Sequence, residues 1–291
     1  MNFLLILAAL ALEFSVTELV GLRSPHWSNA WAARVTGFGR RHSGWRPATA
    51  VTIILGVPLA VAALILALLF SCAHLAGHLG SLFVLLWMLG PADLVREIAE
   101  YRRNLGLPAD ARATTGAAFS VTTAGIDFGA ATGAAAFDDA RADLAALALS
   151  AERGWFAPVF WFALVGPLGA VLYRLCANLE RSPELEPAAS GIVAHLHETL
   201  AWLPGRITAL CLGIAGTLVP VLAELPTIGL WKWGWTNTLV ARAALAAIDH
   251  GRSHDADSEL TAHSRLDQMQ ALIKRALIVW LAVLALGELL R

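Results

Sequence analysis

The chain has 291 residues, of which 57% are hydrophobic and only 15% are charged, and its mean hydropathy is +0.63. A soluble domain carries about 25% charged residues, so the composition predicts a protein that is solvated largely by lipid. The formal net charge of −1 argues against a nucleic-acid partner, which requires a concentrated basic surface.

Apolar segments of about 20 residues, the length that crosses the hydrocarbon of a bilayer, recur along the chain. Four are clear, at residues 2–21, 48–71, 75–92 and 275–290. No basic residue precedes the first, so we expect it to be retained rather than cleaved as a signal peptide. Two more, 154–177 and 204–230, contain prolines and glycines that are typical of broken, re-entrant or protein-buried helices. We therefore expect an all-α, polytopic helical membrane protein with four to six spans, in a single domain over residues 1–291.

Positive charge is distributed unevenly along the chain. Seventeen of the 21 basic residues lie in the regions 22–47, 93–153 and 223–275. Because Lys and Arg accumulate in cytoplasmic loops, we expect cytoplasmic loops at about 22–47, 93–153 and 231–274, and both termini outside. This orientation holds for six spans, which hydropathy favours. It also holds for four spans with two segments that enter and return, which charge favours.

The composition predicts the connections between the apolar segments. Residues 104–135 are rich in Ala, Gly and Thr and indicate a flexible loop, whereas 249–263 indicate a solvated polar loop. Residues 136–152 begin with acidic side chains that suit a helix N-terminus, so we expect a surface helix there. The three cysteines, Cys72, Cys176 and Cys211, are odd in number and do not indicate a disulfide framework.

Polar residues that interrupt the two irregular segments indicate a functional site, because charge is costly at membrane depth. The candidates for ligand binding are Tyr173, Arg174, Asn178, Glu180, Glu198 and Arg206. Glu198 and Arg206 flank a helix break predicted at Pro204-Gly205, and two broken helix ends that meet such charges form a polar pocket. We expect these side chains to converge on a cytoplasm-facing cleft that holds a small anionic group. The alternative is that the arginines extend separately to lipid headgroups.

The sequence His195-x-His197-Glu198 does not predict a metal site. On a helix His195 and Glu198 share a face, whereas His197 points away from both. The motifs of nucleotide binding, of serine hydrolases and of zinc peptidases are also absent from the sequence. We therefore expect neither a metal nor another cofactor, and the sequence assigns no catalytic residue.

Two runs of sequence carry a resemblance to a known family. WFAPVFWFALVGPLGAVLYRL, at 155–175, and SGIVAHLHETLAWLPGRITAL, at 190–210, resemble the shared core of the CobD/CbiB-like membrane superfamily, which contains the cobinamide-phosphate synthases and the AmpE proteins. Ser190-Gly191-Ile192, Leu196-His197 and Trp202-x-Pro204-x-Arg206 are more similar to AmpE. Of the charged synthase motifs, only Glu180, Glu198 and Arg206 keep their chemical character, and nothing corresponds to the Gly-Arg-Asp-Thr motif.

The resemblance implies a multi-pass protein of the bacterial inner membrane that is linked to cell-wall (peptidoglycan) recycling and β-lactamase induction. It implies a regulatory or signalling role rather than an enzymatic one. The expected partners are the lipid bilayer and a small anionic ligand, either muropeptide-like or phosphate-bearing. The alternatives are a membrane-embedded, amide-forming synthase of the cobinamide-phosphate synthase type and a solute transporter. The sequence does not specify the oligomeric state.

Overall fold

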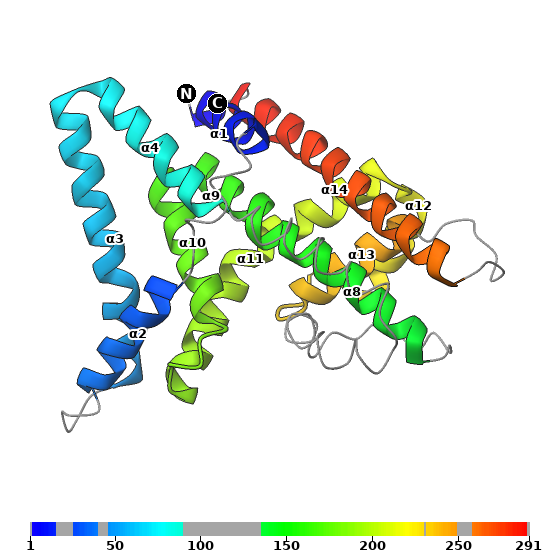
Figure 1. Cartoon of the computed structure of the whole chain (residues 1–291), viewed down its shortest axis with the longest axis horizontal. Helices are drawn as coiled ribbons and strands as arrows, with labels where there is room; N and C mark the ends of the chain where they lie inside the picture. The colour runs from blue at the N-terminus through cyan, green and yellow to red at the C-terminus, as the bar shows by residue number, and fades with distance from the viewer. Residues whose placement is uncertain are drawn as a thin grey trace. The chain divides into compact units, whose positions relative to one another are not determined.

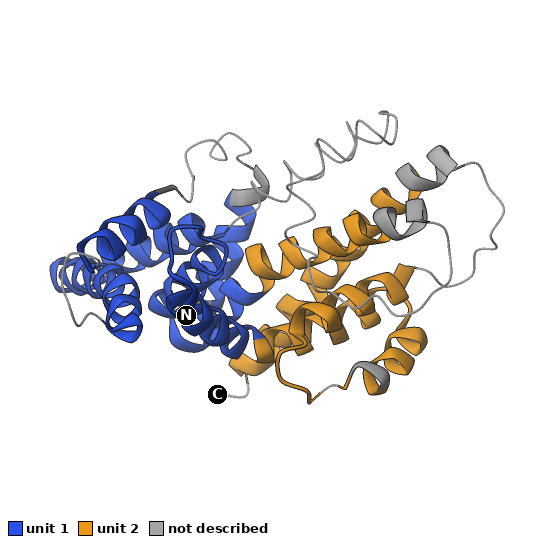
Figure 2. Cartoon of the chain, turned by 90° about the horizontal axis from the view of Figure 1, so that it is seen from below, with its two compact units in different colours: residues 1–92, 157–201 blue, residues 93–156, 202–291 orange. Residues whose placement is uncertain are grey.

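The computed structural model describes residues 2–15, 26–39, 46–89, 135–229, 231–248 and 258–289, and within these ranges the chain is helical without a β-strand (Figure 1). The all-α prediction is confirmed for this part of the chain. The predicted flexible loop falls almost wholly outside the described residues, as does much of the predicted polar loop. The chain divides into two compact units, Met1–Ala92 with Ala157–Ala201 and Asp93–Phe156 with Trp202–Arg291 (Figure 2).

The first unit is built around α10. It contains α1 (Asn2–Ser15), α2 (His26–Gly39), α3 (Pro47–Cys72), α4 (His74–Met88), α9 (Ala157–Val165), α10 (Pro167–Leu179) and the N-terminal part of α11 (Pro187–Ala215). α10 packs against α2, α3, α4 and α9. The extended backbone of Ala73 separates α3 from α4, and the two helices pack against each other (Figure 1). The Phe70 ring occupies the space that a Cβ at Gly77 would take.

The irregular segment 154–177 is interrupted at Gly166, as its glycines and prolines predict. α9 ends at Val165, and α10 begins with Pro167 at its first position. Gly166 has φ +90° and ψ −165°, a conformation that residues with a Cβ rarely adopt. Pro167 suits the first helical turn because its missing N–H would have no partner there. The break therefore follows directly from the Gly-Pro pair.

The break predicted at Pro204-Gly205 is wrong, because α11 is continuous from Pro187 to Ala215 with Pro204 inside it. Proline has no N–H, so it leaves the carbonyl of Leu200 without its usual helical donor. Trp161 Nε1 on α9 donates a hydrogen bond to that oxygen at 3.0 Å. A donor from another helix therefore offsets the cost of the proline.

The same arrangement occurs in α3, which contains Pro58. The carbonyl left without a helical donor is that of Ile54, and Trp31 Nε1 on α2 donates to it at 3.2 Å. In a membrane-embedded helix a neighbouring side chain is one of the few sources of such a donor. Trp31 therefore connects α2 to α3 near Pro58, and Trp161 connects α9 to α11 near Pro204.

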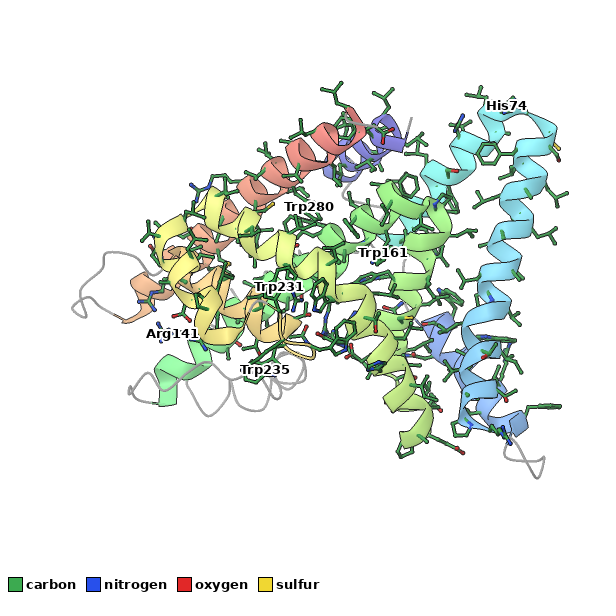
Figure 3. All side chains as sticks on the ribbon, turned by 180° about the vertical axis from the view of Figure 1, so that it is seen from behind. His74, Arg141, Trp161, Trp231, Trp235 and Trp280 are labelled. Atoms are coloured by element: carbon green, nitrogen blue, oxygen red, sulfur yellow. The ribbon has the colours of Figure 1, made fainter. Side chains whose placement is uncertain are left out.

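The second unit is built around α13. It contains α8 (Ala135–Ala151), a π-helical segment (Glu152–Phe156), the C-terminal part of α11, α12 (Leu218–Ile228), α13 (Thr236–Ile248) and α14 (Ser258–Leu289). α13 packs against α8, α12 and α14, and α8 also packs against α14. Trp280 of α14 is fully buried and donates from Nε1 to the carbonyl of Phe156 at 3.2 Å (Figure 3). This bond joins the C-terminal helix to the π-helical segment.

The surface helix predicted at 136–152 is a helix, but its position at the surface is wrong. Every side chain from Leu144 to Leu149 is buried. The leucines alternate with alanines, whose small side chains let α8 approach α13 and α14 on more than one side. Acidic residues at the start of the segment predict a helix, but they do not indicate whether other helices cover that helix.

Two glycines set the path of α11 and α12. A Cβ at Gly205 would lie 2.3 Å from Thr236 Cγ2, so α11 and the start of α13 are in close contact. α11 ends just before Gly216, where a Cβ would lie 2.8 Å from the carbonyl oxygen of Ala247. The hydroxyl of Thr217 donates to the same oxygen at 2.9 Å. The helix within the segment 204–230 is therefore interrupted after residue 215, where the chain packs against the C-terminal end of α13.

Among the described residues, two helices are long and apolar enough to cross a membrane. They are Pro47–Cys72, which matches the predicted segment 48–71, and Ser264–Leu289, which begins before the predicted segment 275–290. Shorter apolar helices occupy Phe3–Leu12, His74–Met88 and Thr236–Ile248.

Candidate functional site

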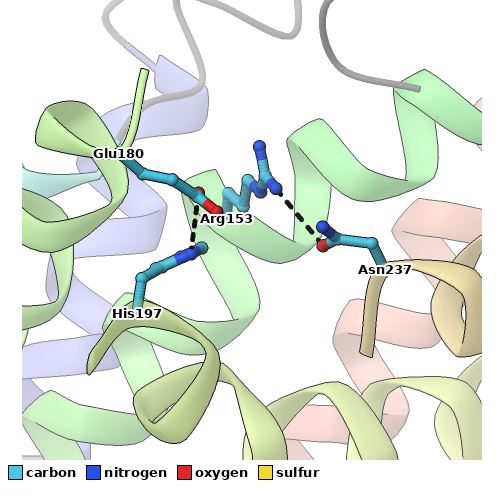
Figure 4. A network of polar contacts seen from close by, with 4 residues as sticks. All are labelled: Arg153, Glu180, His197 and Asn237. Atoms are coloured by element: carbon cyan, nitrogen blue, oxygen red, sulfur yellow. Dashed lines mark hydrogen bonds and ion pairs between the residues drawn. The ribbon is translucent and has the colours of Figure 1, made fainter. Parts of the chain in front are cut away.

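A buried histidine and a carboxylate meet in the first unit. Glu180 is the residue that follows α10, and His197 lies on α11. Oε2 of Glu180 is 2.9 Å from Nδ1 of His197 (Figure 4). His197 is only 2% exposed, whereas the Glu180 side chain is 25% exposed. A carboxylate at this distance helps to fix the orientation of the imidazole ring.

The other ring nitrogen of His197 is the chemically open position. Nε2 is buried, and it has no hydrogen-bond partner among the described residues. Burial of an imidazole nitrogen without a partner is costly unless a ligand or water completes it. An imidazole nitrogen without a proton accepts a hydrogen bond from a donor, and one that carries a proton donates to an anion. The pair can therefore bind a polar ligand or move a proton.

The residues around His197 lie on one face of α10 and one face of α11. Tyr173 and Ala177 of α10 pack with Ala157 and Ala201 in a buried cluster. The Tyr173 ring is fully buried, and its centroid is 5.3 Å from that of the His197 ring. On α11, Val193, His197 and Ala201 are buried at a spacing of four residues, which places them on one face.

The sequence correctly places His197 on a different face from His195 and Glu198. His195 is exposed and Glu198 is half-buried, whereas His197 belongs to the buried stripe. The spacing of residues within α11 therefore does not predict the contact, because its partner Glu180 follows another helix. The signal that could have found it is the spacing of Val193, His197 and Ala201, which predicts an inward histidine.

The six predicted ligand-binding residues fall in two places. Tyr173, Arg174, Asn178, Glu180 and Glu198 belong to the first unit, whereas Arg206 belongs to the second. Arg174, Asn178 and Glu198 are half-buried. Among the described residues, Tyr173 and Glu180 both contact His197. Convergence of all six on one cleft stays a prediction.

Arg206 is bound to the protein itself. Its side chain is 6% exposed, its Nη1 donates to the carbonyl of Trp202 at 2.7 Å, and its Nη2 donates to the carbonyl of Lys232 at 2.8 Å. The guanidinium also lies over the Trp202 ring, 4.0 Å from the centroid. In the alternative prediction Arg206 extends to lipid headgroups, whereas here its guanidinium is buried against the protein.

The second unit contains buried charge at the end of the predicted cytoplasmic region 93–153. Glu152 and Arg153 open the π-helical segment and are 1% and 7% exposed. Nη2 of Arg153 donates to Oδ1 of Asn237 at 3.2 Å (Figure 4). Pro158 follows closely, and its missing N–H prevents regular α-helical bonding at this point. π-helical turns occur frequently at functional sites, so these charges form a second candidate position.

Comparison with known proteins adds no further information. No family model, curated protein or solved structure matches the chain. The described residues therefore define the class by themselves: an all-helical protein with two helices long and apolar enough to cross a membrane and a buried histidine in contact with a carboxylate.

Proposed function

We propose that the chain is a multi-pass protein of the bacterial inner membrane. The observation that carries this proposal is the exposed apolar face of α3. Large apolar side chains on this helix are between 37% and 61% exposed: Val57, Val61, Leu64, Ile65, Leu68 and Phe70. Soluble proteins rarely leave a continuous apolar patch of this kind in water. At about 1.5 Å per residue, 26 helical residues extend about 39 Å, which exceeds the hydrocarbon thickness of about 30 Å.

The C-terminal helix supports the same proposal. Toward its end Ile278, Val283, Leu286 and Leu289 are between 43% and 82% exposed, whereas Trp280 is buried. One side of α14 thus packs on protein and the other side suits lipid. With α1 and α4 as the remaining predicted spans, the proposal extends to four spans, and to six if the segments 154–177 and 204–230 also cross.

We propose a regulatory binding role, as the resemblance to AmpE implies, in cell-wall recycling and β-lactamase induction. The observation in its support is the open Nε2 of His197, which is held by Glu180 and lies beside the buried ring of Tyr173. In the imidazolium form this nitrogen donates to an anion, the chemical character of a muropeptide-like or phosphate-bearing ligand. The proposed site is thus the His197 side of the predicted cleft.

The membrane location is tested by an alkaline carbonate wash of membranes that contain the tagged protein. We expect the full-length chain to stay in the pellet and to require detergent for extraction, because apolar helices do not leave lipid for water. Release by carbonate alone would refute the integral location.

The binding role is tested by mass spectrometry of small molecules that co-purify with the protein from native membranes. We expect an anionic compound with the wild type, and a loss of about tenfold with His197→Gln, since a hydrogen bond to a charged group contributes about 1.5 kcal/mol or more. His195→Gln is the matched control, because this exposed histidine is on the same helix. Equal retention by both variants would contradict the role of His197.

A membrane-embedded synthase is the second candidate, because a carboxylate-contacted imidazole is also a general-base arrangement. The chain lacks most of the charged synthase motifs, so we expect no turnover of cobinamide precursors by the purified protein. Product above a blank that disappears with Glu198→Gln would favour the enzyme over the regulator.

A further inference from the structure

A pocket outside the His197 site combines an apolar wall with one cation. It has a volume of about 650 Å³ and lies in the second unit, between α12 and the turn that follows it. The residues that line it are Leu222, Leu225, Pro226, Gly229, Trp231 and Lys232. Lys232 is thus the charged member of an otherwise apolar and aromatic lining.

The turn beside the pocket has the composition of a membrane interface. Trp231, Trp233 and Trp235 are 78%, 49% and 36% exposed, and the Lys232 ammonium lies 4.9 Å from the centroid of the Trp235 ring (Figure 3). Tryptophan favours the headgroup level of a bilayer, where its ring is in apolar surroundings and its N–H is near water. Val219, three residues before Leu222 on α12, is 77% exposed.

The backbone of the turn is held in place by residues of α11. Arg206 donates to the backbone carbonyl of Lys232 and stacks on Trp202. The Trp202 ring is in turn 6.0 Å from that of Trp231 and 6.1 Å from that of Trp233. Arg206 and Trp202 thus hold the backbone of Lys232 and the neighbouring indoles at the edge of the pocket.

We propose that this pocket binds an anionic phospholipid, with the phosphate at Lys232 and the first part of an acyl chain against Leu222 and Leu225. The charge complementarity is specific: the apolar wall matches a hydrocarbon chain, and the single ammonium matches a phosphate. Trp231 and Lys232 begin the predicted cytoplasmic region 231–274, and the other lining residues belong to the apolar segment 204–230. The site is therefore predicted at the level of the cytoplasmic leaflet, where basic residues meet anionic headgroups. The inference rests on the proposed membrane location.

The experiment uses the fact that Lys232 and Lys274 are the two lysines of the chain. Both are exposed, and Lys274 lies on α14 and does not line the pocket. The acetylation rate of each lysine in the purified full-length protein is measured by mass spectrometry with dihexanoyl phosphatidylglycerol, dihexanoyl phosphatidylcholine or glycerol 3-phosphate. At a lipid concentration about four times Kd, we expect acetylation of Lys232 to slow about fivefold.

The controls separate the components of the site. Lys274 should show no protection, glycerol 3-phosphate should protect neither lysine because it has no acyl chain, and the zwitterionic lipid should protect Lys232 less than the anionic lipid. Trp231→Ala should abolish the protection of Lys232. Equal protection of both lysines, or no protection by phosphatidylglycerol, overturns the site.

The outcome is distinguishable from a failure of the membrane proposal. Protein that stays in the carbonate pellet but shows no protection of Lys232 contradicts the lipid site alone. Protein that carbonate releases, but in which phosphatidylglycerol protects Lys232, contradicts the integral location alone.

Discussion

Trp161 donates the hydrogen bond that lets Pro204 remain inside α11. Trp161→Phe keeps an aromatic ring but removes the N–H, so the Leu200 carbonyl loses its donor in a half-buried position. We expect the free energy of unfolding to fall by about 1–2 kcal/mol, the cost of leaving such a group unsatisfied. Unfolding of the detergent-solubilised protein, followed by circular dichroism, measures the loss.

A double-mutant cycle identifies the cause of that loss. Pro204→Ala supplies an amide N–H to the Leu200 carbonyl, so Trp161→Phe should cost less in that background than in the wild type. Equal costs in the two backgrounds would show that Trp161 acts through packing alone.

The candidate site shows which residues can be identified from sequence alone. Glu180 is a predicted site residue because a carboxylate next to apolar sequence is costly, and the structure places it against His197. The sequence assigns no role to His197, which does not share a face with His195 and Glu198. That same fact turns it toward another helix, and contacts between helices are not encoded in the spacing within one helix. The partners of Arg206 are likewise not predictable from the sequence, because they are backbone carbonyls, which every residue has.

At the scale of helices, Gly205 sets the distance between α11 and the start of α13. Gly205→Ala places a Cβ 2.3 Å from Thr236 Cγ2, so one of the two helices must shift. We expect the free energy of unfolding to fall by about 1–3 kcal/mol, as for other overpacked contacts. The measurement is the same unfolding transition.

Gly191 is the matched control on the same helix, because a Cβ there meets nothing within 4 Å. Gly191→Ala should therefore leave stability unchanged or raise it by up to about 1 kcal/mol. The second variant Thr236→Ser removes Cγ2 and should restore part of the stability of Gly205→Ala. A loss of stability with Gly191→Ala equal to that with Gly205→Ala would contradict the close-contact explanation.

The helices themselves were largely predictable, whereas their interruptions were only partly so. Apolar sequence over 48–71 predicts α3 within one residue at each end, and the Gly166-Pro167 pair predicts the break between α9 and α10. The position of the second break was not predictable, because the effect of Pro204 depends on whether another helix supplies a donor. The burial of α8 was not predictable for a related reason, since its alanines suit either a surface or a tight packing contact.

At the scale of the whole chain, the distribution of Lys and Arg predicts that the residues before α3 are cytoplasmic. α3 is long enough to cross the bilayer, so its last residue, Cys72, should reach the opposite side. Cys72 is exposed, whereas Cys176 and Cys211 are buried. The natural sequence therefore contains its own topology probe. We expect a membrane-impermeant maleimide to label the wild type in whole cells and Cys72→Ser not to be labelled.

The opposite end of α3 provides the complementary measurement. Ala48 is exposed in the first turn of α3, and Ala48→Cys in the Cys72→Ser background should react with the maleimide only after the inner membrane is permeabilised. Labelling of Ala48→Cys but not of Cys72 in intact cells would reverse the orientation. Labelling of both would show that α3 does not cross the membrane, because a helix of about 39 Å that spans the hydrocarbon cannot present both ends to one side.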